Sequence, residues 1–125
     1  MDVTPLIKSG TQVIQGYANG GFKVSGQTYE GAVMVTPSGT LAWDAPADVK
    51  GLKPEHFQSL IDVSGDVDVV LLGAGVSIAF LAADIKNHIK NNGLSIDVMD
   101  TGAACRTYNV LVAEGRRVCA LLLPI

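Results

Sequence analysis

Short apolar runs alternate with glycine-rich turns along the N-terminal part of the chain. The runs with strand-like alternation are Thr11–Tyr17, Phe22–Val24, Tyr29–Thr36 and Leu41–Trp43. The turn Asn19-Gly20-Gly21 separates the first two runs, and an Asn-Gly pair between apolar runs is a strong hairpin signal. Closely spaced strands joined by such turns predict an N-terminal antiparallel meander.

Two kinds of apolar pattern alternate after about residue 50. Helix-compatible spacing covers Pro54–Ile61, Phe80–Asn91 and Ala103–Glu114, and strands are expected at Asp68–Leu72, Leu94–Met99 and Val118–Leu123. The apolar residues of the first and last of these strands follow one another without a break. An unbroken run of this length is typical of a strand buried on both faces. Strands that alternate with helices predict α/β layering, and the residues alone favour parallel strands throughout this half.

The composition indicates one folded domain over residues 1–125. Hydrophobic residues make up 48% and charged residues 17% of the chain, whereas an average globular protein has about 25% charged residues. Such a chain is not intrinsically disordered. A net charge of −3 argues against a nucleic-acid partner, because binding to nucleic acid depends on clustered positive charge. The apolar content predicts a sheet buried on both faces, a homo-oligomer or partner interface, or both.

The apolar segments are too short to cross a membrane. The longest, Val118–Leu123, is far shorter than the roughly 20 residues that a helical span needs. Met1–Lys8 lacks the basic and apolar regions of a secretory signal, and it is not Arg-rich or Ser-rich like a mitochondrial presequence. We therefore expect a soluble cytoplasmic protein without a transmembrane segment.

Two glycine-bearing turns follow predicted strands and precede predicted helices. The first is Gly73-Ala74-Gly75, and the second, Asp100-Thr101-Gly102, opens the helix Ala103–Glu114. Ligands of α/β sheets bind at the carboxyl ends of strands, where glycine allows close approach and helix amides attract anions. The two turns are therefore candidates for one shared pocket, although a tight turn and an N-cap at Asp100 or Thr101 explain the same residues.

Arg106 and Asn109 extend this candidate site along the helix. They are three residues apart and share a helix face, beside the helix N-terminus. Arg106 could contact a carboxylate or phosphate there, and a surface ion pair is the alternative. The residues expected to form a pocket or binding surface are Gly73, Ala74, Gly75, Thr101, Arg106 and Asn109.

No set of residues has the pattern of a catalytic or metal site. Cys105 and Cys119 have apolar neighbours and are expected to be buried, inert thiols. The two histidines, His56 and His88, lie on helix faces expected to be solvated, so neither pairs with a cysteine as a Cys/His hydrolase requires. Without a nucleophile, base and orienting group, the sequence predicts a non-enzyme with no metal and no cofactor.

A resemblance to a known family covers nearly the whole chain. The strongest segments are Met99–Leu111, with the block Arg106-Thr107-Tyr108-Asn109, and Glu114–Val118. Further matching segments are Ile14–Tyr17, Gly20–Phe22, Tyr29–Gly31, Trp43 and Leu71–Gly75. These segments resemble a small domain family of bacteria, archaea and mitochondria that includes mitochondrial respiratory complex I assembly factor three. This chain departs from the family at Ala74, where relatives often carry threonine.

The resemblance implies a single three-layer α/β domain, with α+β character in the N-terminal meander and a mixed central sheet with helices. It implies no enzyme activity. By resemblance we expect a non-catalytic accessory protein that contacts respiratory-chain or inner-membrane subunits, at the inner-membrane periphery. Without a presequence, the chain looks like a bacterial relative. The alternatives are a small-molecule (anion) binding protein or an enzyme that uses the glycine-lined edge, and a homo-oligomer.

Overall fold

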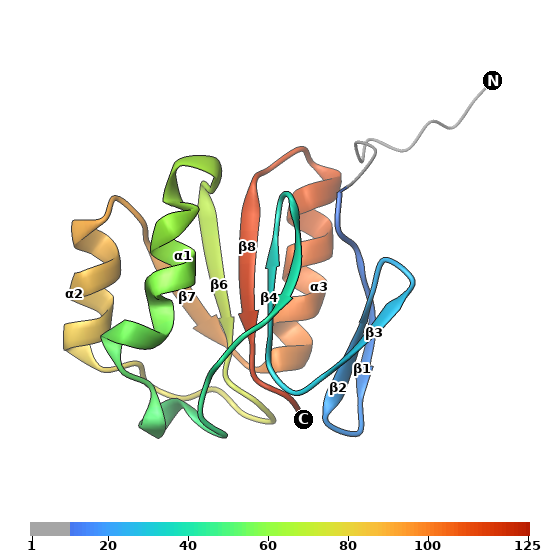
Figure 1. Ribbon diagram of the computed structural model, residues 1–125, viewed down its shortest axis with the longest axis horizontal. Coiled ribbons are helices and arrows are strands. Elements are labelled where there is room, and N and C mark those ends of the chain that lie inside the picture. Colours follow the sequence, from blue (N-terminus) through green and yellow to red (C-terminus); the bar gives the residue numbers. More distant parts are fainter. Residues whose placement is uncertain (1–10) are drawn as a thin grey trace.

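A five-stranded mixed sheet forms the centre of the structure, a computed structural model that describes residues 11–125 (Figure 1). Its strands, in spatial order, are β5 (Gly39–Ala42), β4 (Val33–Thr36), β8 (Val118–Leu122), β6 (Val69–Gly73) and β7 (Ile96–Met99). β6 is parallel to β7 and β8, whereas β4 is antiparallel to β5 and β8. The mixed sheet is confirmed, and the strands of the second half are all parallel. The expectation for Met1–Lys8 lies outside the described residues.

A second, three-stranded antiparallel sheet precedes the central one. It contains β1 (Ile14–Ala18), β2 (Gly21–Val24) and β3 (Gln27–Glu30). The sequence analysis expected one strand over Tyr29–Thr36, and this is wrong, because the run is divided between β3 and β4. Gly31 has a φ of +79°, and its N–H donates to the Gly20 carbonyl at 2.8 Å. That left-handed residue, which costs glycine least, turns the chain from one sheet into the other.

Helices cover both faces of the central sheet and complete three layers. α1 (Gln58–Asp62), α2 (Ala83–Asn91) and the 3-10 helices η1 (Val49–Gly51), η2 (Pro54–Phe57) and η3 (Ser64–Asp66) belong to one side. On that side Trp43 packs edge-on against Phe57, with ring centroids 5.7 Å apart. α3 (Thr101–Ala113) and the three-stranded sheet share the second apolar core, in which Phe22 is buried. The predicted α/β class is confirmed.

The boundaries of all three expected helices differ from the observed ones, and the expected helix Ala103–Glu114 is α3, Thr101–Ala113. The expected helix Pro54–Ile61 is a 3-10 turn, η2, followed by α1. The expected helix Phe80–Asn91 begins only at Ala83, because Ala82 is extended, with φ −59° and ψ 145°. Phe80 therefore lies in a loop. No helix within residues 11–125 is both long and apolar enough to span a membrane.

Candidate functional site

The two glycine-bearing turns meet at one edge of the central sheet, and the Thr101 hydroxyl joins them. This hydroxyl is fully buried; it accepts a hydrogen bond from the Gly75 N–H at 2.9 Å and donates one to the Leu123 carbonyl at 2.7 Å. The Thr101 N–H donates to the Gly75 carbonyl, and the Ala74 N–H donates to the Met99 carbonyl, both at 2.8 Å. The structure thus brings together the predicted residues of both turns.

These contacts engage the groups that an anion would need. The amides of Ala74, Gly75 and Thr101 all donate within the fold, and Asp100 caps α3 by accepting from the Ala103 N–H at 2.8 Å. The fourth predicted residue of the edge, Gly73, approaches Thr101 so closely that a Cβ on it would lie 2.9 Å from the Thr101 Cα. In this structure the glycine-lined edge is closely packed, and its hydrogen bonds connect the segments that follow β6 and β8 to the start of α3.

Asn109 and Tyr108 connect α3 to the start of β1 and to the segment just before it. The Asn109 side chain forms hydrogen bonds with both backbone groups of Ile14. Its Oδ1 accepts from the Ile14 N–H at 2.9 Å, and its Nδ2 donates to the Ile14 carbonyl at 2.7 Å. The Tyr108 hydroxyl donates to the Gln12 carbonyl at 2.9 Å. Burial of Tyr108 raises the pKa of its hydroxyl. The sequence analysis named Tyr108 only as part of the family-like block and did not predict this contact.

Arg106 is the member of the block whose charged group faces solvent. Its Nη1 lies 3.5 Å from the hydroxyl of Tyr17, a long contact on an exposed side chain. Gly102 lies beneath this pair, since a Cβ there would be 2.6 Å from the Tyr17 hydroxyl. The ion pair found within residues 11–125 is the one between Arg117 and Asp68, at 2.7 Å. Within the described residues the Arg106 guanidinium therefore takes part in no ion pair.

The buried cysteines are poor nucleophiles. Cys105 and Cys119 are both free thiols in the core, and burial raises the pKa of each thiol to about 12. With such a pKa, both side chains stay protonated near neutrality. Their reactivity is therefore low, because the thiolate is the reactive form of cysteine. His56 is engaged at the start of η2, where its Nδ1 accepts from the Lys53 N–H at 2.9 Å. In the described part of the chain, no three His, Cys, Asp or Glu side chains are placed to hold a metal.

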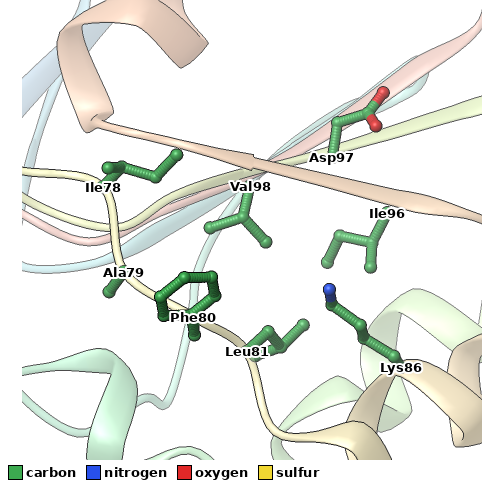
Figure 2. A pocket seen from close by; sticks show the side chains of 8 residues that line it. All are labelled: Ile78, Ala79, Phe80, Leu81, Lys86, Ile96, Asp97 and Val98. Atoms are coloured by element: carbon green, nitrogen blue, oxygen red, sulfur yellow. The ribbon is translucent and has the colours of Figure 1, made fainter.

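An apolar hollow beside β7 is the surface feature that sequence reasoning missed. It has a volume of about 310 Å³ and is lined mainly by Ile78, Phe80, Leu81, Lys86, Ile96 and Val98 (Figure 2). Phe80 is 97% exposed and Ile78 is 69% exposed. The signal was present as alternating apolar residues directly after Gly75, but assignment of Phe80 to a helix concealed it. A surface of this kind is typical of an interaction site.

Known proteins resemble this chain over nearly its full length. The family described as "Protein of unknown function (DUF498/DUF598)" matches residues 14–123. An uncharacterized protein of Rhodobacter capsulatus is 32% identical over 94% of this chain and 88% of its own length. The NADH dehydrogenase (ubiquinone) 1 alpha subcomplex assembly factor 3 of Danio rerio is 30% identical over 90% of this chain, which spans 64% of that protein. The crystal structure of an outer membrane protein from Bartonella henselae superposes with a TM-score of 0.85, at 35% identity over 92% of this chain and 96% of its own.

Proposed function

This chain belongs to the family of proteins of unknown function DUF498/DUF598, and from that membership we propose that it is a non-catalytic accessory protein for the assembly of a respiratory or inner-membrane complex. Its homology to assembly factor 3 of NADH dehydrogenase supports an assembly-factor-like role. The family match carries the proposal, because residues 14–123 include the central sheet, α3 and the contacts of Thr101.

The chemistry of the described residues agrees with binding rather than catalysis. The polar side chains of the predicted site make hydrogen bonds inside the fold, whereas Arg106 and the apolar loop around Phe80 face outward. An exposed guanidinium forms two-pronged hydrogen bonds with carboxylates, and exposed aromatic residues are enriched at interfaces. In this proposal the protein acts at the periphery of the inner membrane, where Arg106 contacts an acidic residue of a partner subunit.

Affinity capture tests the proposal. The tagged protein is recovered from its own host in mild detergent, alongside Arg106→Ala and the matched control Lys23→Ala, which removes an exposed cation from β2. We expect a reproducible set of respiratory-chain or membrane-insertion subunits with the wild type and with Lys23→Ala, and loss of that set with Arg106→Ala. Urea unfolding of each variant shows whether the fold is unchanged. Recovery of the bait alone in every sample contradicts the proposed function.

A further inference from the structure

We propose that the open edge of β7 binds an extended segment of a partner protein as an added strand. The segment carries a large apolar side chain and, two residues away, a carboxylate. This inference rests on the proposed function, because it specifies how the partner of an accessory protein is held. Three features carry it: the direction of the β7 backbone groups, the apolar hollow, and two lysines beside it.

The backbone of β7 has hydrogen-bonding groups that point away from the sheet. β7 is an edge strand, since β6 is its neighbour on one side and no strand in the described residues lies on the other. The Met99 carbonyl accepts from the Ala74 N–H, so Met99 faces the β6 side. Because successive residues of a parallel strand face opposite neighbours, Asp97 also faces β6, and the N–H and C=O groups of Ile96 and Val98 face outward. An added strand would pair with these groups.

The apolar hollow lies beside the same two residues. Ile96 and Val98 point from β7 into the hollow, whereas Asp97 points away from it (Figure 2). Leu81 forms a buried wall, and the exposed side chain of Phe80 forms part of the rim. Its volume of about 310 Å³ is at the small end of the roughly 300–1,000 Å³ typical of ligand pockets. This size suits one large side chain of an added strand.

A basic hollow continues from the apolar one. It is lined by Lys86, Lys90, Gly93, Leu94, Ser95 and Ile96, and it shares Lys86 and Ile96 with the apolar hollow. In the described residues neither lysine forms an ion pair. Two unpaired cations at one end of an apolar groove complement a carboxylate on the occupant.

The spacing on the partner follows from strand geometry. Val98 lines the apolar hollow but not the basic one, whereas Ile96 lines both hollows. Side chains on one face of a strand recur every second residue, so a strand paired with β7 places one side chain beside Val98 and the next beside Ile96. The occupant is therefore an extended segment with an apolar and an acidic residue at positions i and i+2.

Peptide selection on the full chain tests this proposal. A display library of random dodecapeptides is selected against the wild type and against Val98→Pro, which removes one outward N–H and leaves the bonds to β6, as proline in edge strands does. The enriched peptides are synthesised with a fluorescent label, and anisotropy measures their affinity. Lys86→Glu and Phe80→Asp change only exposed side chains of the groove, and Val110→Asp changes an exposed apolar residue of α3 as the matched control.

We expect enriched peptides to share the apolar and acidic pair and to slow hydrogen exchange at the Ile96 and Val98 amides. Lys86→Glu should weaken binding roughly five- to tenfold, as expected for reversal of an exposed charge. Val98→Pro and Phe80→Asp should weaken binding about tenfold or more, and Val110→Asp should leave it unchanged. Phe80 is almost fully exposed, so Phe80→Asp tests the groove even if Val98→Pro unfolds.

Three results would overturn the proposal. The first is no peptide enrichment by the wild type over Val98→Pro. The second is binding that neither protects the Ile96 and Val98 amides nor responds to Lys86→Glu. The third is sedimentation with phosphatidylglycerol vesicles that Phe80→Asp abolishes, without peptide enrichment, because the loop would then face a lipid surface. Capture from the host with Lys86→Glu separates the two proposals: a partner recovered as well as by the wild type leaves the proposed function intact and excludes the groove.

Discussion

Replacing Asn109 by alanine is the most direct way to learn whether the Arg-Thr-Tyr-Asn block serves folding. The wild-type side chain makes two hydrogen bonds to the backbone of Ile14, at 2.9 and 2.7 Å, across 95 residues of sequence. Asn109→Ala removes both bonds and leaves the Ile14 N–H and C=O without these partners. The Ile14 side chain is buried, so water has limited access to the strand there.

The expected loss of stability is about 2–4 kcal/mol. Each lost hydrogen bond contributes about 0.5–1.5 kcal/mol, and a backbone group left unsatisfied in a partly buried place costs about 1–3 kcal/mol. A domain with a free energy of unfolding of about 5–15 kcal/mol should still fold after this loss. The variant should therefore be purifiable and show a lower urea midpoint with an unchanged slope.

Urea unfolding followed by circular dichroism measures this loss, with Arg106→Ala on the same helix as the matched control. Arg106 makes one exposed contact of 3.5 Å, so its loss should change the free energy of unfolding by less than about 0.5 kcal/mol. A loss below about 0.5 kcal/mol for Asn109→Ala would refute the reasoning. An equal loss of stability in both variants would also refute it, because the effect would then come from the helix and not from the hydrogen bonds between Asn109 and Ile14.

A second substitution at this position adds a test by pH. The carboxylate introduced by Asn109→Asp can accept from the Ile14 N–H but faces the Ile14 carbonyl oxygen, so its charged form is disfavoured in the folded state. The folded pKa should therefore lie above the unfolded value of about 3.9. Relative to the wild type at the same pH, the variant should be most stable below that unfolded pKa and should lose stability as the pH rises through the folded pKa. A variant whose stability relative to the wild type rises over that window would contradict the assigned geometry.

Three further predictions concern the buried Thr101, the two buried cysteines and the exposed pair Arg117–Asp68. Thr101→Val keeps the shape of a buried side chain but leaves two backbone groups unpaired, so urea unfolding should show a loss of about 2–3 kcal/mol. Burial raises the thiol pKa of Cys105 and Cys119 to about 12, so iodoacetamide at pH 8 should label neither until urea unfolds the chain, and rapid native labelling would contradict their burial. The hydrogen bond from Arg117 lowers the pKa of Asp68. The stability from this pair is therefore present above the unfolded pKa and lost as pH falls through the folded pKa, so Asp68→Asn should be less stable than the wild type at neutral pH and equally stable in strong acid.

Local patterns were sufficient for much of the fold. The unbroken apolar runs at β6 and β8 predicted buried strands, and both are buried in the central sheet. Asp100 was identified as a possible N-cap, and its side chain caps α3. These features depend on residues that are neighbours in sequence, so period and capping chemistry identify them. The meeting of the turns around Gly75 and Thr101 was also foreseeable, because parallel strands end at one edge.

The uses of the site residues depended on contacts between distant segments. Asn109 and Thr101 could have faced a ligand, and they instead hydrogen-bond the backbone at Ile14 and Leu123. No local pattern distinguishes these outcomes, because the partner groups come into reach only when the strands and α3 pack together. The same holds for Phe80, which lies in the loop before α2 and is 97% exposed. Hydrophobicity and turn chemistry thus specify the elements, whereas packing specifies which polar groups are satisfied and which apolar surface remains open.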